Sequence, residues 1–232
     1  MAAASGLAWL AGCASQQSSP AGLAHDPPPF IQAEALAAAQ AAGSVHVDMV
    51  SSSASGRVVY STDVSSTAGR QVITVAGGEA TVLDVAGVGY VSGNPAALVG
   101  FFGFPPSASA RLTGRWVSFR SGQPYYQQVV DAVTLGSALG VVRLSGRLSS
   151  KGMESVGGQR VVGVRGIAPS VPGVPAGTKA TLYVTTTGRL LPVSYQEVSG
   201  STRLSAVFSR WGEKVSVAAP RDAVPITSVV RS

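Results

Sequence analysis

The stretch Ser44-Val45-His46-Val47-Asp48-Met49 decides how the chain is expected to fold. Apolar Val45, Val47 and Met49 alternate with polar residues, which is the period of a β-strand that buries one face. Similar short runs continue to residue 92 and are separated by turns rich in glycine and serine. Four or five strands joined by such short turns predict an antiparallel meander.

The last third of the chain shows the same period of two. A loop rich in proline and glycine is expected at 170–177, and Gly188 marks a hairpin turn between two strands. Between the two β regions, Trp116 to Phe119 predicts one more short strand. The strands expected in the last third are 141–149, 159–167, 179–186, 190–199 and 202–209, followed by a final pairing near 214–218.

Three segments depart from this period and predict helices, at 31–42, 94–103 and 124–139. The first is rich in alanine and ends at Gly43, a residue typical of helix C-termini. The second opens on Asn94-Pro95, a cap followed by proline at the first helical position, and ends at Pro105-Pro106. Together these elements predict an α+β fold that is mostly antiparallel β.

The N-terminal run Leu10-Ala11-Gly12-Cys13 is typical of a lipobox, and it contains the only cysteine of the chain. In proteins with this signal, a diacylglycerol is attached to the sulfur and the preceding residues are removed. We therefore expect lipidation at Cys13; the alternative is a lone cysteine in a leader helix. The expected divisions are a signal peptide at 1–12, a lipidated flexible tether at 13–29 and one folded domain at 30–228.

This leader places the protein outside the cytoplasm, held by its lipid on the outer face of the cytoplasmic membrane. The residues before the lipobox are few and uncharged, so the signal peptide is expected to be truncated at its N-terminus. No second apolar stretch of about 20 residues occurs, so we expect no membrane-spanning helix.

Composition narrows the range of partners. The 232 residues include 45% apolar and only 12% charged residues, and the net charge is +6. The basic residues are scattered along the chain, which favours a role in solubility over contact with an anionic membrane face or lipid headgroups. The same scatter, together with the expected export, argues against nucleic acid as a partner.

Groups for catalysis are scarce. The chain has two histidines, His25 in the tether and His46 on the first strand. His46 and Asp48 lie at i and i+2 and therefore share one face, but a solvent-facing polar edge explains them better than a hydrolase site. No glycine-rich nucleophile elbow and no spacing of metal ligands is found. We therefore expect no enzyme, no metal and no cofactor.

The most apolar segment is a candidate wall for a lipid cavity. It is too apolar for a surface helix, so it forms either ordinary core or a lid over an acyl-chain cavity. Two residues of the next predicted helix share a face and can line the same wall. The cavity candidates are Leu98, Phe101, Phe102, Phe104, Tyr126 and Val130. Arg111 and Arg115 flank this region and are the candidates for holding an anionic headgroup.

The end of the chain resembles a known family. The quoted motifs are Val207-Phe208-Ser209-Arg210-Trp211-Gly212-Glu213-Lys214-Val215, Ala219-Pro220, Val224-Pro225-Ile226 and the hairpin Gly188-Arg189-Leu190-Leu191-Pro192-Val193. With the lipobox and the order of elements, they resemble the LolA-like lipoproteins of actinobacteria, the group that contains LppX and LprG. The resemblance covers about residues 30–228, and Trp211 is expected to anchor the closing turn to the core.

The resemblance implies both a fold and a function. It implies a half-open β-barrel wrapped on helices, with an apolar cavity for acyl chains and no catalytic residues. The first expected function is therefore a membrane-anchored envelope lipoprotein that binds or carries a lipid or lipoglycan. The alternative is a non-enzymatic interaction or regulatory module with a closed core, which contacts an envelope protein partner.

Overall fold

The computed structural model describes residues 25–123, 125–130, 133–170 and 174–229. The predicted signal peptide, the predicted lipobox with Cys13 and most of the predicted tether lie outside the described residues. Within the described part, no helix is long and apolar enough to cross a membrane.

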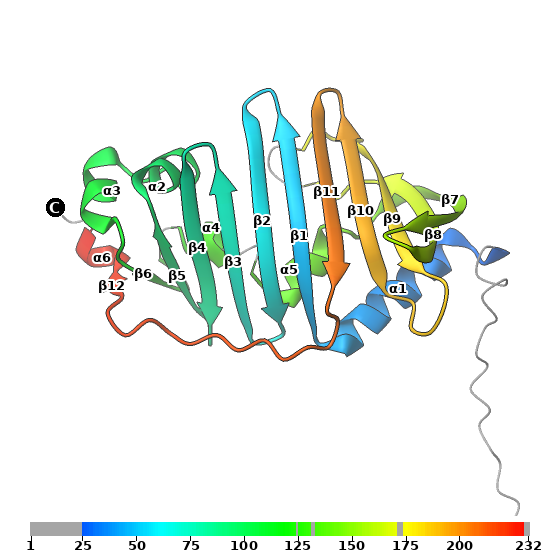
Figure 1. Ribbon diagram of the computed structural model, residues 1–232, viewed down its shortest axis with the longest axis horizontal. Coiled ribbons are helices and arrows are strands. Elements are labelled where there is room, and N and C mark those ends of the chain that lie inside the picture. Colours follow the sequence, from blue (N-terminus) through cyan, green and yellow to red (C-terminus); the bar gives the residue numbers. More distant parts are fainter. Residues whose placement is uncertain (1–24, 124, 131–132, 171–173, 230–232) are drawn as a thin grey trace, which may run out of the picture.

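The described strands form one sheet in the order β12-β6-β5-β4-β3-β2-β1-β11-β10-β9-β8-β7. Neighbouring strands are antiparallel except β12 and β6, which are parallel. The sheet is not closed, so β12 and β7 are its two edges (Figure 1). The strands are β1 Ser44–Ser53, β2 Gly56–Ser65, β3 Ala68–Val75, β4 Gly78–Val85, β5 Val88–Gly93, β6 Val117–Arg120, β7 Ser145–Val156, β8 Gln159–Ile167, β9 Lys179–Thr185, β10 Pro192–Ser199, β11 Thr202–Ser209 and β12 Val224–Pro225.

Two meanders meet in the middle of this sheet. Strands β1 to β6 follow one another outward in one direction, and β11 back to β7 follow in the other. They join where β1 pairs with β11, with Val47 opposite Phe208 and Met49 opposite Ala206. The predicted meander and its return are therefore confirmed, and the alternation seen at residues 44–49 directs Val45 and Val47 into the core.

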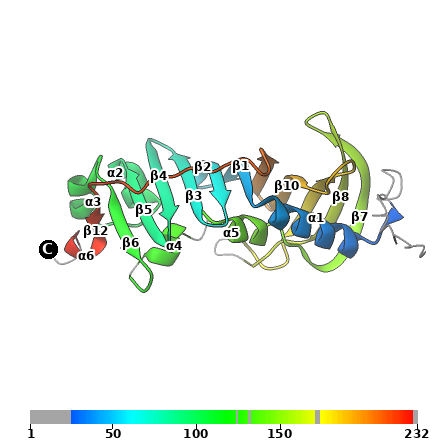
Figure 2. The same cartoon turned by 90° about the horizontal axis from the view of Figure 1, so that it is seen from below.

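The helices are α1 Pro28–Ala42, α2 Pro95–Gly100, α3 Pro106–Leu112, α4 Tyr126–Val130, α5 Leu135–Gly140 and α6 Ile226–Val229. Helix α1 ends because Gly43 takes a left-handed conformation, with φ of 78°. Helices α1, α4 and α5 lie on one side of the sheet, which we call its inner face (Figure 2). Helices α2, α3 and α6 gather near the β6 edge (Figure 1).

The buried apolar residues form two large clusters, one in each half of the sheet. The first, the α1 core, lies between the inner face of β1, β8, β9, β10 and β11 and the helices α1 and α5. The second, the aromatic core, lies between β3, β4, β5 and β6 and the helices α2, α3 and α4. Each half therefore has its own interior within one continuous sheet.

Two predicted helices differ from the observed ones. The helix expected at 124–139 is divided into α4 and α5, because Thr134 is extended and its hydroxyl accepts a hydrogen bond from the Ser137 amide, 3.1 Å away. Pro105-Pro106 ends α2's segment as expected, but Pro106 also starts the unpredicted α3, since proline suits the first turn of a helix.

The end of the chain also differs from the prediction. The first strand of the last third starts at Ser145 and not at 141, because α5 extends to Gly140. Residues 214–218 form no strand: Arg210 and Gly212 have left-handed φ values of 52° and 79°, which turn the chain out of β11. The connecting segment 210–223 then runs past the ends of the strands, at the bottom of Figure 1, to β12 beside β6.

Candidate functional site

An apolar cavity of about 130 Å³ lies inside the α1 core. One wall is the inner face of the sheet, where side chains two residues apart point the same way. Residues paired across the strands meet there, because Ala206 of β11 lies opposite both Met49 of β1 and Tyr195 of β10. The sheet wall consists of Val47, Met49, Thr62, Gln71, Tyr195, Glu197, Leu204, Ala206 and Phe208.

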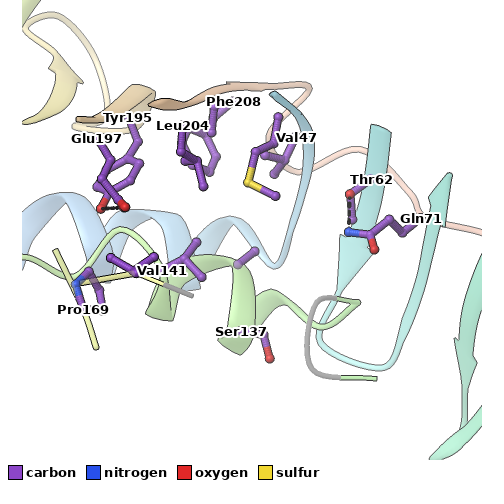
Figure 3. A pocket seen from close by; sticks show the side chains of 14 residues that line it. Val47, Thr62, Gln71, Ser137, Val141, Pro169, Tyr195, Glu197, Leu204 and Phe208 are labelled. Atoms are coloured by element: carbon purple, nitrogen blue, oxygen red, sulfur yellow. Dashed lines mark hydrogen bonds between the residues drawn. The ribbon is translucent and has the colours of Figure 1, made fainter. Parts of the chain in front are cut away.

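The opposite wall comes from α5 and a loop. Ser137 and Ala138 of α5 line it, together with Val141 at the helix end and Pro169 and Val174 of the loop. Figure 3 shows Val141 and Pro169 across the cavity from Tyr195 and Leu204. Val141 lines the cavity and is nevertheless 39% exposed. Val141 thus lies both at the cavity and at the protein surface, at the C-terminal end of α5.

Polar groups in the sheet wall are paired with one another. The Gln71 amide donates to the Thr62 hydroxyl at 3.0 Å, and the Tyr195 hydroxyl donates to the Glu197 carboxylate at 3.1 Å (Figure 3). Because each pair satisfies its own hydrogen bond, the polar groups do not require water in the cavity. What a ligand meets is therefore mainly hydrocarbon.

Among the described residues, Glu197 is the only one that brings a carboxyl group to this lining. Its side chain is 6% exposed, and burial raises the pKa of Glu197, while the hydrogen bond from Tyr195 opposes that rise. Burial and the neighbouring carboxylate also raise the pKa of the Tyr195 hydroxyl. A buried carboxyl group of this kind favours uncharged ligand chemistry beside Glu197, because burial disfavours a negative charge at this place.

The six predicted cavity residues lie in the other half of the molecule. They do come together, because all six belong to the aromatic core or pack against it. Phe101 meets Phe102 with ring centroids 5.0 Å apart, Phe102 meets Phe104 at 6.1 Å, and Phe104 stacks on Phe119 at 6.2 Å. None of the six lines the 130 Å³ cavity. Phe104 instead lines a separate hollow of about 220 Å³.

The two predicted headgroup arginines are placed differently from each other. Arg111 lines a small hollow of about 220 Å³ together with Phe104, Tyr125 and Val229. Arg115 is exposed in the turn after α3 and is not part of that hollow. Neither arginine lies at the mouth of the cavity in the α1 core.

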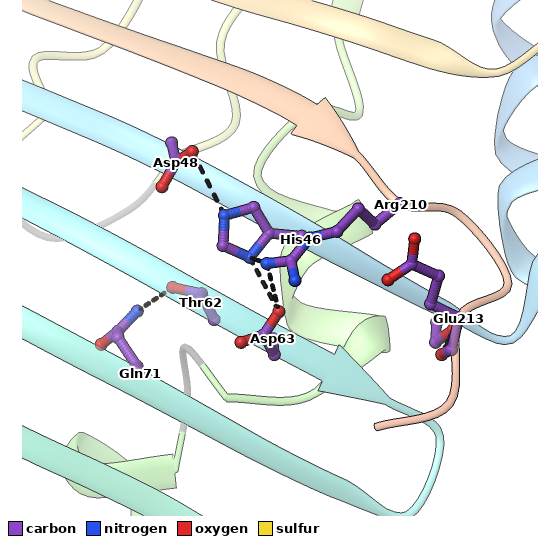
Figure 4. A network of polar contacts seen from close by, with 8 residues as sticks. His46, Asp48, Thr62, Asp63, Gln71, Arg210 and Glu213 are labelled. Carbon is purple, nitrogen blue, oxygen red and sulfur yellow. Dashed lines mark hydrogen bonds and ion pairs between the residues drawn. The ribbon is translucent and has the colours of Figure 1, made fainter. Parts of the chain in front are cut away.

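His46 is held in a polar cluster on the outer face of the sheet. Its Nε2 lies 3.2 Å from Asp48, and its Nδ1 lies 2.7 Å from Asp63 and also contacts Arg210 (Figure 4). Arg210 in turn binds Asp63 at 2.9 Å. The expected contact between His46 and Asp48 is thus present, and it belongs to an ion-pair network that ties the start of the connecting segment to β1 and β2.

The ion pairs of this cluster hold neighbouring chain segments together, and we call it the His46 clip. The two carboxylates approach opposite sides of the imidazole ring, so they do not converge on one point as metal ligands would. In the described part of the chain, no group of three His, Cys, Asp or Glu residues is arranged to hold a metal ion. Both ring nitrogens face charged side chains, which leaves neither directed at a serine hydroxyl as a hydrolase would require.

Sequence reasoning missed the actual cavity, although a signal for it exists. Thr62, Gln71 and Glu197 occupy inward positions of their strands and are buried at 4%, 4% and 6% exposure. Polar residues at inward positions of apolar strands are unusual, and Ala206 between Leu204 and Phe208 leaves space. Together these residues indicate an interior that is not completely filled by side chains.

Comparison with known proteins identifies the fold. No family model and no curated protein matches the sequence. Among solved structures, the lipoprotein LppX of Mycobacterium tuberculosis matches with a TM-score of 0.53 and 20% identity, over 82% of this chain and 99% of that chain. LprF of Mycobacterium bovis matches with a TM-score of 0.53 and 17% identity, over 83% and 96%. The chain therefore has the open, mostly antiparallel LolA-like fold of the LppX-type lipoproteins, as the sequence predicted.

Proposed function

We propose that this protein is a non-enzymatic envelope lipoprotein that binds the acyl chain of a lipid or lipoglycan in the cavity of the α1 core. The observation that carries the proposal is the cavity itself, with its mainly hydrocarbon walls and with Val141 exposed at its rim. The likeness in fold to LppX, which is named as a lipoprotein, supports the same class.

The cavity size limits what enters. An engineered apolar cavity of about 150 Å³ stays dry and binds benzene, so a cavity of this order holds a few carbon atoms. The 130 Å³ cavity thus accommodates the end of one acyl chain. The rest of the chain and the headgroup lie outside, past Val141 and the loop that carries Pro169. A ligand with several long chains requires the loop and α5 to move away from the sheet.

The proposed location follows from the leader and not from the fold. Cys13 is the proposed lipidation site and 13–29 the tether, which holds the domain at the outer face of the cytoplasmic membrane. In a protein anchored in this way, we expect the cavity to take up lipids from the same membrane. The proposed partners are therefore the membrane and a lipid ligand, with an envelope protein as a further partner if the lipid is handed on.

Binding of a fluorescent fatty acid to the purified full chain tests the proposal. We expect saturable binding, and we expect Ala138→Phe to lower the affinity at least roughly tenfold, because a phenyl ring fills a cavity that holds about one benzene. Ala138 faces the cavity from α5. Ala110→Phe is the matched control, since Ala110 is an exposed position of α3 in the other half.

Three results would count against the proposal. The wild type fails to bind any acyl chain, Ala138→Phe binds as tightly as the wild type, or Ala110→Phe loses as much affinity as Ala138→Phe. The first result favours the interaction module with a closed core. Circular dichroism of each variant establishes that the fold is retained.

A further inference from the structure

A basic groove crosses the outer face of the sheet near the β7 edge. The strand register aligns Ser149 of β7, Arg165 of β8, Thr181 of β9 and Gln196 of β10 in one row. These four residues line an open hollow of about 680 Å³. The hollow lies on the side of the sheet opposite the apolar cavity, because Val164 and Leu182 alternate with Arg165 and Thr181 and point into the α1 core.

Three exposed cations line this groove without a neutralising partner among the described residues. They are Arg147, Arg165 and Lys179, and no carboxylate is part of the lining. Lys151, which lies further along β7, differs from these three cations because it has an acidic partner: its ammonium group lies 2.8 Å from Glu154. None of the ion pairs found in the described part involves the three groove cations.

The groove belongs to a strongly basic part of the chain. Residues 143–203 contain eight Lys or Arg and two Asp or Glu, and the rest of the chain contains nine of each. The whole net charge of +6 is thus carried by the strands β7 to β10, their turns and the start of β11. Of the two carboxyl groups in this stretch, Glu197 is buried on the inner face and Glu154 is paired with Lys151.

The described part of the chain begins beside β7, at the same end of the molecule as the groove. Helix α1 starts beside β7 and runs across the inner face toward β1, so its N-terminus lies at the groove end of the molecule (Figure 1). The Gln32 side chain exchanges two hydrogen bonds with the backbone of Leu144, just before β7, which fixes this placement. A chain held to a membrane through residues before α1 is therefore held at its basic end.

We propose that this groove binds the phosphate groups of anionic lipids at a membrane surface. Guanidinium groups suit phosphate oxygens because their N–H donors form paired hydrogen bonds, and the neighbouring hydroxyl and amide groups add donors. The charge of the groove is complementary to an anionic leaflet. The site is separate from the cavity, and the proposal does not rest on the cavity holding a lipid.

The test is vesicle binding by the full chain carrying Cys13→Ser, which removes any lipid anchor. We expect it to bind vesicles of equimolar phosphatidylcholine and phosphatidylglycerol and not vesicles of phosphatidylcholine alone, with affinity that falls as salt rises. The triple variant Arg147→Gln, Arg165→Gln, Lys179→Gln should lower the partition coefficient roughly 100-fold, since each cation near an anionic surface contributes a factor of about five.

A matched variant separates the groove from net charge. Arg57→Gln, Arg120→Gln, Arg221→Gln removes the same charge from exposed positions outside the groove, and it should bind mixed vesicles almost as the wild type does. Ala138→Phe should also keep vesicle binding, because it changes only the apolar cavity. Unchanged thermal midpoints show that the exposed substitutions leave the fold intact.

Two outcomes would overturn the proposal. They are equal binding to both vesicle types and an equal loss in the two triple variants. Inorganic phosphate should displace the protein from mixed vesicles more strongly than chloride of the same ionic strength, because it competes for the same cations.

Discussion

The two halves of the sheet bury their apolar residues in different ways. The aromatic core is closed by Phe102, Phe104 and Phe119, whose rings contact one another behind β5 and β6. The α1 core is built mainly from valine, leucine and alanine, and it leaves a cavity between β1, β10, β11 and α5. One sheet thus supports an interior of contacting aromatic rings at one end, with a hollow of about 220 Å³ beside Phe104 and Arg111, and a mainly aliphatic interior that contains the 130 Å³ cavity at the other.

The difference shows how one fold can combine stability with the proposed binding of an acyl chain. Large aromatic side chains fill space from several sides, whereas shorter aliphatic side chains fill less of the space between sheet and helix. If the proposed function is right, the aromatic core mainly stabilises the domain and the cavity of the α1 core receives the ligand. The predictions below separate these two roles, beginning with the largest expected effect.

Phe119→Ala should lower the free energy of unfolding by about 3–5 kcal/mol, because the ring is fully buried and stacks on Phe104. Met49→Ala, on the wall of the cavity, should cost less, about 1–2 kcal/mol, since one side of Met49 already faces empty space. Denaturant unfolding measures both. Equal losses would show that the two interiors are packed alike.

Trp211→Ala should lower the free energy of unfolding by about 2–3 kcal/mol, less than full burial would give, because the indole is only partly buried. The indole stacks on Phe208 and donates from Nε1 to the Pro192 carbonyl at 3.1 Å. Hydrogen exchange should show the loss first in β10 and β11 rather than in β3 to β5. A loss below about 1 kcal/mol would mean that Trp211 does not anchor the closing turn.

Glu197→Gln tests the buried carboxyl group that lines the cavity of the α1 core. Its folded-state pKa is raised above the ordinary 4.5, so the folded chain holds the proton more tightly than the unfolded chain. The stabilisation is complete below pH 4.5 and is lost as the pH rises through the folded-state pKa. We expect Glu197→Gln to be more stable than the wild type above neutral pH, on the order of 1 kcal/mol, with no such gain in acid. A gain independent of pH would contradict this account.

Arg210→Ala should have the smallest effect, a loss of less than about 1 kcal/mol that shrinks further in high salt. Arg210 and Asp63 are 47% and 38% exposed, so water screens their ion pair. The cluster lies where the two halves meet, and fatty-acid binding should be unchanged. A loss above about 2 kcal/mol would show that the His46 clip holds the halves together.

Local features of the fold were predictable from the sequence. The strands after Ser44, the glycine stop of α1 at Gly43 and the cap at Asn94 depend on neighbouring residues alone. The sequence did not predict the break at Thr134 or the start of α3 at Pro106. Threonine also occurs inside helices, and proline can either end one helix or begin the next, so these residues alone do not decide the boundary. The parallel pairing of β12 with β6 was missed because it joins segments more than a hundred residues apart.

The binding features were harder to predict because they depend on register. The cavity arises from the volumes of side chains that meet across five strands, and the most apolar segment, around Phe102, fills its own space instead. The basic residues are scattered in the sequence, as composition suggested, yet Arg147, Arg165 and Lys179 gather when β7, β8 and β9 pair. Their proximity follows from strand pairing, which the spacing in the sequence does not reveal.

Photo-crosslinking tests most directly whether the ligand occupies the cavity of the α1 core. A fatty acid with a diazirine near its methyl end is bound to the full chain and irradiated, and the labelled residues are mapped by mass spectrometry. The account predicts labels on the cavity wall, at Met49, Val141 and Leu204. Labels on Phe101 to Phe104, or no specific label at all, would contradict it.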